Sequence, residues 1–103
     1  MKKAIELIAE ERKRQIEVEG FTPEHDDVWK RGEIAQAASC YSSIALFRSE
    51  RHDGAPFLWP WHRISWKPTP DDRIRELIKA GALIVAEIER IQRIEQNKTL
   101  ETN

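Results

Sequence analysis

The sequence predicts an all-α protein in which three main helices form a small bundle, with a long loop rich in tryptophan and proline before the third helix. Three observations support this fold class. Apolar residues recur at helical spacing in three segments, proline-containing stretches separate these segments, and no segment has the clear pattern of a strand. The 103 residues fit one domain, residues 1–103, and because so small a domain buries a modest core, we expect dimerisation to complete the fold.

The charge balance and the single cysteine narrow the function classes. Lysine and arginine number 17 and the acids 18, so the net charge of −1 does not indicate binding to a nucleic-acid polymer or to a membrane surface. No apolar run approaches the roughly 18 residues of a membrane helix, and the start "MKKAIELIAEERKRQ" becomes charged too early for a signal peptide. Because Cys40 is the single cysteine, no internal disulfide can form, and we expect a reducing, cytoplasmic location.

The first helix is predicted over residues 1–19. The face expected to point inward mixes apolar with polar residues: Ala4, Ile5, Ile8, Glu11, Arg12, Gln15, Ile16, Val18 and Glu19. Gly20 is expected to end this helix. An acidic turn over residues 20–31 follows, in which Thr22 is expected to cap, and Pro23 to open, a short helical turn or a loop.

The second helix is predicted over residues 32–48. Its inward face is expected to be Glu33, Ala37, Cys40 and Ile44, and its many alanines and serines allow a neighbouring helix to approach closely. Residues 49–69 form the predicted loop, because three prolines and a glycine forbid a continuous helix there. Loops of this length are uncommon unless they are functional or disordered, and the aromatic residues in this one need burial or a partner.

The third helix is predicted over residues 70–95, with Thr69 as its N-cap and Pro70 at its first position. The segment "AGALIVA", residues 80–86, is apolar on every side, which is typical of a central, buried helix. Together with the small-residue face of the second helix, it exceeds what three helices can bury among themselves, so we expect self-association through these helices. The polar residues 96–103 are expected to form a frayed tail.

Four glutamates lie on or beside the apolar faces of the predicted helices: Glu11, Glu33, Glu76 and Glu87. A carboxylate that faces a core needs a cation, a proton or hydrogen bonds, because an unpaired one is costly. One alternative is a set of salt bridges with nearby arginines and Lys79. The other is a shared Mg²⁺ or Mn²⁺, since such hard cations prefer carboxylate oxygens, and the acidic turn would then contribute Asp26 and Asp27.

Two further features each allow two interpretations. His25 is either a capping or supporting residue of the acidic turn, or part of a His–Asp–Asp set that could hold a metal. The segment "WPW" either covers the open end of the bundle or offers a face on which a base stacks, with Lys67 and Arg73 beside it for phosphate.

Five stretches carry a resemblance to a known family: "ERKRQIEVEGFTPEHDD", "GEIAQAASCY", "WPW", "WKP" and "RELIKAGALIVAEIERI". Over about residues 11–94, the chain resembles short phage and prophage proteins grouped with dATP/dGTP pyrophosphohydrolases. These are related to the MazG-like all-α nucleotide pyrophosphohydrolases, whose acidic pattern is E-E-x-x-E on one helix and E-x-x-D on the next. The chain departs from this pattern, because Arg14 and Lys79 stand where the two motifs end in an acid.

The resemblance implies a phage- or prophage-encoded, Mg²⁺-dependent enzyme that cleaves purine (deoxy)nucleoside triphosphates to monophosphate and pyrophosphate. We expect its metal ligands to be Asp27, Glu33, Asp26, Glu11 and Glu76. Either His25 or Glu19 would position or deprotonate the attacking water. We expect the nucleotide to contact Trp59, Trp61, Trp66, Lys67, Arg73 and Lys79.

The alternative function is that of a non-catalytic, phage-encoded helical module, which would bind a nucleotide or a host protein. A purely structural helical adaptor is a third possibility. The positions of four acids in space distinguish the first two hypotheses. If these acids converge, the enzyme is favoured, and if they lie apart, the binding module is favoured. They are Asp26, Asp27, Glu33 and Glu76.

Overall fold

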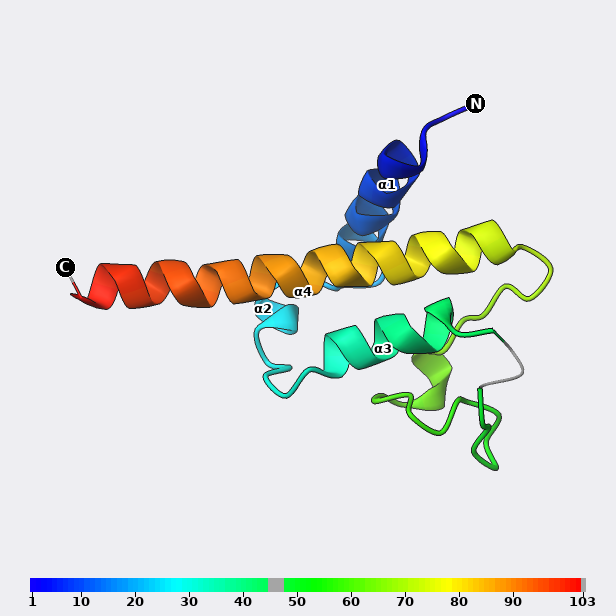
Figure 1. Ribbon diagram of the computed structural model, residues 1–103. Coiled ribbons are helices and arrows are strands. Elements are labelled where there is room, and N and C mark those ends of the chain that lie inside the picture. Colours follow the sequence, from blue (N-terminus) through cyan, green and yellow to red (C-terminus); the bar gives the residue numbers. More distant parts are fainter. Residues whose placement is uncertain (45–47, 103) are drawn as a thin grey trace.

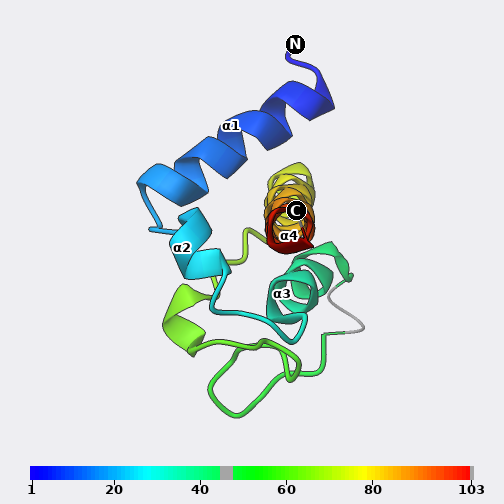
Figure 2. The same cartoon turned by 90° about the vertical axis from the view of Figure 1, so that its left-hand side faces the viewer.

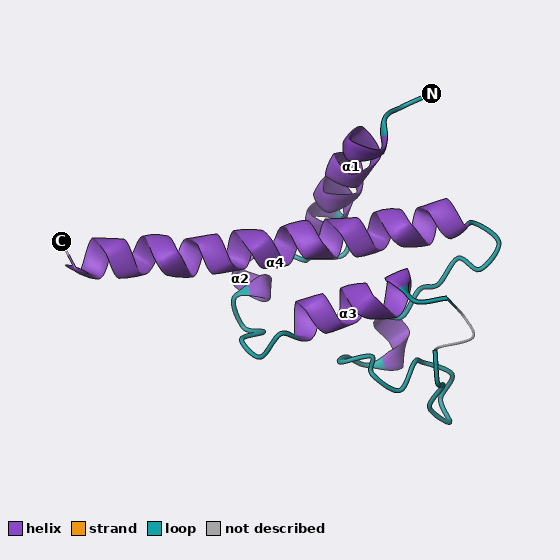
Figure 3. Ribbon diagram, viewed as in Figure 1, coloured by secondary structure: helices purple, strands orange, loops and turns teal. Residues whose placement is uncertain are grey.

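The computed structural model describes residues 1–44 and 48–102, and this part of the chain is helical without a β-strand (Figures 1 and 3). The all-α prediction is therefore confirmed. The elements follow the chain in the order α1 (Ala4–Glu17), α2 (Pro23–Asp26), α3 (Glu33–Ser42), the 3₁₀ turn η2 (Arg63–Ser65) and α4 (Arg73–Thr102). None of these helices is long and apolar enough to cross a membrane.

The long helix α4 is the centre of the molecule, and the other helices pack along its first two thirds. α3 runs alongside α4, whereas α1 crosses it steeply (Figure 1). The view along α4 places α1 and α3 on different sides of it, with α2 beside the end of α1 (Figure 2). The last turns of α4 project beyond the rest of the chain (Figure 1).

The apolar core lies between α3, α4 and the loop over residues 49–69, which we call the Trp loop. Small side chains dominate the contact of the two helices, so their backbones approach closely as the sequence predicts. The buried members of this core are Ile34, Ala37, Ala38, Cys40, Tyr41, Ala55, Trp59, Ala80, Leu83 and Ala86.

The face that α1 buries differs from the prediction. Its buried residues are Glu11, Arg12 and Gln15. Ile5 and Val18, which were expected to point inward, are 81% and 69% exposed. α1 therefore meets α4 mainly through polar side chains, and this requires specific partners for each charge.

α3 is shorter than the predicted helix over residues 32–48, because it ends at Ser42. The predicted end over residues 45–47 lies outside the described residues. Two features explain the early end. Serine hydroxyls bond to the last backbone carbonyls, as when Ser43 Oγ donates to Ser39 O at 2.8 Å. The guanidinium of Arg73 also donates to the carbonyls at this end, including Tyr41 O at 2.8 Å.

α4 begins three residues later and ends later than predicted. Pro70 does not open the helix; instead Asp72 Oδ1 accepts from the backbone N–H of Arg75 at 3.1 Å, which is the pattern of an N-cap. The helix continues to Thr102, so residues 96–102 are helical and not a frayed tail. The segment contains the good helix formers Gln96, Lys98 and Leu100, and no proline or glycine interrupts it.

The acidic turn folds as its sequence indicates. Thr22 Oγ1 accepts from the backbone N–H of His25 at 3.2 Å, and Pro23 occupies the first position of α2. Gly20 adopts a φ of 78°, a conformation that glycine tolerates best. These features bring the chain from the end of α1 to the side of α4, which positions Asp26 and His25.

Candidate functional site

The acids predicted to bind a metal are each engaged by a separate partner. Glu11 is 1% exposed and accepts from Arg14 at 2.7 and 2.9 Å and from Arg75 at 2.5 Å. Asp26 is 2% exposed and accepts from Arg12 at 2.9 Å. These charge-assisted hydrogen bonds explain how α1 and α2 bury acids without a metal ion.

The remaining predicted ligands are occupied elsewhere. Asp27 pairs with Arg93 of α4 at 2.7 Å. Glu76 accepts from Arg48 at 3.0 Å on the α3 side of α4. Glu33 accepts from a backbone N–H two residues before it at 2.7 Å, at the start of α3.

The donor atoms of a single chain therefore do not fit the predicted metal site. In the part of the chain that the structure describes, no group of three or more His, Cys, Asp or Glu side chains lies close enough together to hold a metal ion. The four acids whose convergence was expected do not form such a group: Asp26, Asp27, Glu33 and Glu76. Salt bridges account for Asp26, Asp27 and Glu76, and also for Glu87, which pairs with Arg90 at 2.6 Å. Glu33 is instead held by a backbone hydrogen bond.

A cluster with excess positive charge lies where α1, α4 and the end of the Trp loop meet. We call it the cationic seam, and it consists of Arg14, Lys67, Arg75, Lys79, Glu11 and Glu19. Four cations and two acids leave a net charge of +2 in this cluster. The cavity within it has a volume of only about 20 Å³, so the side chains close over it in this conformation.

Lys79 is the least compensated cation of the seam. It is 8% exposed, and its Nζ donates to the backbone carbonyl of Lys67 at 2.7 Å and lies 5.6 Å from the centre of the Tyr41 ring. No carboxylate oxygen of the described residues lies within 4.0 Å of this Nζ. Burial, followed by repulsion from Arg75, lowers the pKa of Lys79, which is the behaviour of an ammonium group that lacks a close anion.

Glu19 closes the seam on the solvent side. Its carboxylate accepts from Lys67 at 2.9 Å and from Arg14 at 3.1 Å. The hydrogen bond from Lys67 lowers the pKa of Glu19; burial opposes this, and the hydrogen bond from Arg14 adds to it. A carboxylate whose pKa is lowered is a weaker base, so this environment does not favour the predicted role of Glu19 in deprotonating water.

Glu11 occupies the inner end of the seam. Burial alone would raise the pKa of Glu11, but the hydrogen bond from Arg14 and the charges of Arg75 and Lys79 lower it overall. The carboxylate thus stays ionised and holds the cations together.

An aromatic pocket of about 440 Å³ adjoins the cationic seam. It is lined by Phe21, His25, Trp29, Pro60, Trp61, His62 and Ser65. The rings of Phe21 and His25 stack with centres 5.0 Å apart, and the Trp61 ring lies 5.6 Å from that of Trp29. Phe21, Trp61 and Ser65 line both the pocket and the seam, so the two spaces are adjacent.

Three buried polar atoms around these two spaces have no hydrogen-bond partner within the described chain: Gln15 Oε1, Trp29 Nε1 and Trp61 Nε1. Buried polar groups are normally paired, so such atoms call for an explanation. The two indole N–H groups and the amide oxygen are themselves buried, so a ligand could pair with them only after the surrounding side chains move.

The three predicted stacking residues have different environments. Trp61 lines the aromatic pocket. Trp59 is 4% exposed and donates through Nε1 to His62 O at 3.2 Å, so it is a core residue and not a stacking surface. Trp66 packs on Tyr41 at 4.6 Å, with the Arg48 guanidinium 5.5 Å above it, on the side of α3.

The other residues predicted to contact the nucleotide also lie in different parts of the structure. Lys67 and Lys79 belong to the seam, but Arg73 holds the end of α3 through carbonyls, which removes it from the site. His25 lies in the aromatic pocket, where its Nδ1 is 3.1 Å from Asp26 Oδ1. It therefore supports the acidic turn and lines the pocket at once.

Sequence reasoning missed Phe21 and Trp29 as site residues and did not assign Arg14 to binding. A signal was present for all three. Phe21 and Trp29 flank the acidic turn at equal distances from His25, and Arg14 follows Glu11 by one helical turn.

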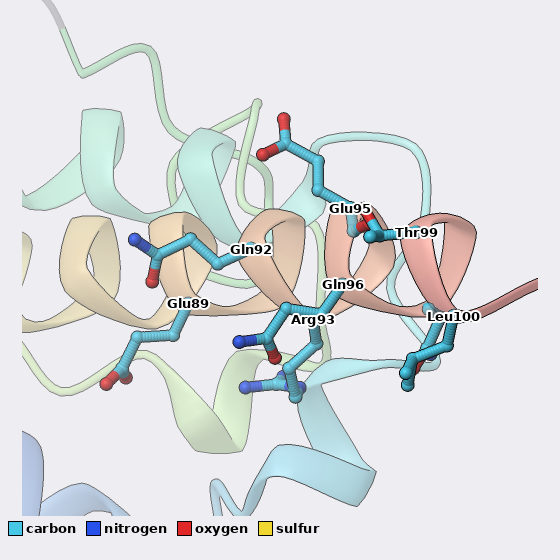
Figure 4. Close-up of a pocket in the computed structure, with 8 residues that line it drawn as sticks. Glu89, Gln92, Arg93, Glu95, Gln96, Thr99 and Leu100 are labelled. Carbon is cyan, nitrogen blue, oxygen red and sulfur yellow. The ribbon is translucent and has the colours of Figure 1, made fainter. Parts of the chain in front are cut away.

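A further hollow of about 920 Å³ lies along the projecting end of α4 (Figure 4). Its lining side chains all belong to that one helix: Glu89, Gln92, Arg93, Glu95, Gln96, Asn97, Thr99 and Leu100. A hollow lined by one helix is an open surface, so we do not regard it as a ligand site.

Comparisons with family models, with curated proteins and with solved structures found no match for this chain.

Proposed function

We propose that this protein binds a purine nucleotide, with the base in the aromatic pocket and the phosphates in the cationic seam. The observation that carries the proposal is that the two spaces adjoin through Phe21, Trp61 and Ser65. A flat base suits aromatic walls, and a phosphate chain suits an excess of positive charge. The pocket has a volume of about 440 Å³ and is open to solvent, so a base could enter it without a change in the chain.

The base would stack on Phe21 or Trp61. Stacking of this kind contributes about 1–3 kcal/mol for each base as judged by alanine substitution. The unpaired indole N–H of Trp29 supports this assignment, because an acceptor atom on the edge of a purine could satisfy it once the side chains around the pocket move.

The phosphates would replace the carboxylate of Glu19 as the anion between Arg14 and Lys67. Because the cavity within the seam is only about 20 Å³, phosphate entry requires Glu19 to swing toward solvent. Lys79 donates to a backbone carbonyl and has no close carboxylate, so the phosphate would give it a close anion. The proposal also explains how the chain departs from the acidic pattern of the MazG-like proteins that it resembles. Arg14 and Lys79 stand where that pattern has metal-binding acids, so these cations would hold the phosphate directly.

Binding, rather than hydrolysis, is the function this geometry supports best. The acids that would hold a metal are paired with arginines, and we derive no hydrolytic step through them. The protein would sequester or present a nucleotide, which corresponds to the binding-module alternative.

Calorimetric titration of dATP and dGTP tests this proposal. We expect binding in EDTA, and similar affinity after Mg²⁺ or Mn²⁺ is added, with no products detected by chromatography. Trp61→Ala should weaken binding about five- to 150-fold, and Lys67→Gln about tenfold or more, because hydrogen bonds to charged groups are strong.

Two control variants match these changes outside the site. Phe57→Ala removes an exposed aromatic ring from the same loop, and Lys13→Gln removes an exposed charge from α1, and neither should alter affinity. Binding that needs a divalent metal, or the release of pyrophosphate, would overturn the metal-independent proposal in favour of a hydrolase. No binding under either condition would show that the pocket and the seam do not form a nucleotide site.

A further inference from the structure

Two histidines lie on the wall of the aromatic pocket, His25 of α2 and His62 at the start of η2. The other described residues of the wall offer a ligand no free polar side-chain atom in this conformation. Phe21 and Pro60 are apolar, and the indole nitrogens of the two tryptophans are buried. Ser65 Oγ already donates to His62 O at 2.8 Å and accepts from an indole N–H at 3.3 Å. The two imidazoles are therefore the polar side chains with which a ligand in this pocket can pair.

His25 is held as a hydrogen-bond acceptor for a group in the pocket. Its Nδ1 lies 3.1 Å from Asp26 Oδ1, and the same carboxylate accepts from Arg12 at 2.9 Å. Because a carboxylate only accepts, the proton of the neutral imidazole is on Nδ1, and Nε2 carries a lone pair. No described residue hydrogen-bonds to this Nε2, and unlike the indole nitrogens it is not buried.

His62 is held with the opposite polarity. Its Nδ1 accepts from the backbone N–H of Ile64 at 3.1 Å, the bond that caps η2. A ring nitrogen that accepts carries no proton, so the proton of this neutral imidazole is on Nε2, which is a donor. His62 is exposed, and no described residue accepts from its Nε2. The pocket thus offers one acceptor and one donor, each fixed by a contact within the chain.

We propose that these two imidazoles select adenine. His25 Nε2 accepts from the 6-amino group, and His62 Nε2 donates to a ring nitrogen next to that group. This inference rests on the proposed nucleotide site and adds its base specificity. Adenine has a donor beside an acceptor on both of its edges, because its amino group lies between N1 and N7, whereas guanine has only acceptors, O6 and N7, on one edge. Adenine therefore matches the two histidines whichever edge enters the pocket.

The ring of His25 is also fixed in place by its aromatic neighbours. Phe21 stacks on it with the ring centres 5.0 Å apart, and Trp61 meets it edge-on at 6.4 Å. A ring that is already held loses little conformational freedom when a ligand binds, so its acceptor nitrogen contributes more to selection.

Calorimetric titration with three nucleotides tests the selection without any change in the protein. At about pH 8, imidazoles are neutral. dATP should then bind about fivefold more tightly than the triphosphate of unsubstituted purine deoxyriboside, which keeps N1 and N7 but lacks the amino group. dGTP should also bind more weakly than dATP. Equal or tighter binding of either competitor would overturn the selection of adenine and leave the nucleotide site intact. If none of the three binds, the nucleotide site itself is overturned, and this inference with it.

Two substitutions at His25 separate recognition of the base from support of the acidic turn. His25→Asn keeps an N–H donor for Asp26 but removes the acceptor at the Nε2 position, so it should abolish the preference for dATP over the unsubstituted nucleotide. His25→Gln places an amide oxygen near the Nε2 position but loses the bond to Asp26, so it should retain the preference. Loss of the preference in His25→Gln alone would show that His25 acts only through Asp26. The wild-type comparison of nucleotides does not depend on how either variant folds.

His62→Asn is the complementary change. Its amide oxygen can still accept from the backbone N–H of Ile64, but the donor at the Nε2 position is lost. Both dATP and the unsubstituted nucleotide should bind about fivefold more weakly, because both retain the ring nitrogens, and the preference between them should stay. His52→Asn, a change at an exposed histidine outside the pocket, is the matched control and should alter neither affinity. A lost preference in His62→Asn, or affinities no weaker than those of His52→Asn, would contradict the assignment of His62.

Discussion

The helices α1 and α3 both pack on α4, but they do so with opposite chemistry. The buried residues of α3 are Ile34, Ala37, Ala38, Cys40 and Tyr41. Those of α1 are Glu11, Arg12 and Gln15, while its isoleucine at position 5 and its C-cap valine are exposed. The α3 contact is therefore stabilised by apolar burial, and the α1 contact by paired charges.

This difference indicates which side of α4 can exchange partners. Apolar packing is non-directional, and opening it is unfavourable because apolar surface is exposed to water. A contact made of ion pairs costs desolvation and gains little net free energy, so a competing anion can replace one of its members. The cationic seam and the aromatic pocket both lie on the α1 side, which is where a ligand can enter without disturbing the core.

The largest expected effect is on the α3 side. Ile34→Ala should lower the free energy of unfolding by about 4 kcal/mol, because a 1% exposed side chain leaves a cavity among rigid neighbours. Val18→Ala, at a 69% exposed position that ends α1, should change it by less than about 0.5 kcal/mol. Chemical unfolding at one fixed protein concentration measures both. Similar losses for the two variants would mean that α1 contributes an apolar interface after all.

The next effect concerns the charges that α1 buries. Glu11→Ala should cost about 3 kcal/mol, because it leaves the cations of the seam without their central anion. Glu10→Ala, which removes an exposed acid paired with Lys2, should cost less than about 1 kcal/mol. Chemical unfolding monitored by circular dichroism compares the two. An unchanged or increased stability of the Glu11 variant would show that this carboxylate is not a structural partner.

The sequence predicted part of the α3 side of the molecule. Ala37 and Cys40 are buried as expected, but Ile44, which was expected to point inward, is 51% exposed, whereas Ile34 and Tyr41 are buried without having been predicted. Apolar burial depends on residue type and helical period, so the positions of Ala37, Cys40 and Leu83 could be assigned before the fold was known. The cap by Thr22 was equally local. The end of α3 was harder to predict, because the carbonyls at its end are held by Arg73, some 30 residues later.

The α1 side could not be assigned in the same way. Sequence spacing identified Glu11 and Asp27 as acids that need partners, but not which partners. Arg75 reaches Glu11 across 64 residues, and Arg93 reaches Asp27 across 66 residues. Contacts of this range are decided by the fold and not by local spacing, so a shared metal remained an equally valid solution until the geometry was known.

Acid should weaken the α1 side before the α3 core. The pKa values of Glu11 and Glu19 on the α1 side, and of Glu76 on the α3 side, are lowered in the folded protein, so the unfolded chain binds more protons below about pH 4.5. The α1 side should respond first because it has two such acids and little apolar burial, whereas the α3 side has one such acid and an apolar core. The stability these acids contribute is present above that pH and is lost as pH falls through their lowered values. Hydrogen exchange at decreasing pH, corrected for the intrinsic rate, should show α1 opening first. Glu11→Gln should flatten the response, and simultaneous opening of α1 and α3 would contradict it.

A small effect on stability, but the most informative effect on function, is expected at Glu19. Glu19→Gln removes the anion between Arg14 and Lys67 at the solvent side of the seam, and it should change the free energy of unfolding by less than about 1 kcal/mol, because pairs near the surface contribute little. It should strengthen the binding of pyrophosphate and of dATP several-fold, since the ligand no longer competes with the carboxylate. Glu17→Gln, a change at an exposed acid two residues earlier, at the end of α1, is the matched control and should alter neither quantity. Calorimetric titration of the two variants at low and high salt separates this local effect from a general change in charge, because general attraction is screened by salt and affects both variants equally. If Glu19→Gln binds either ligand no better than Glu17→Gln does, the carboxylate of Glu19 does not occupy a phosphate position, and the exchangeable partner on the α1 side must be sought elsewhere.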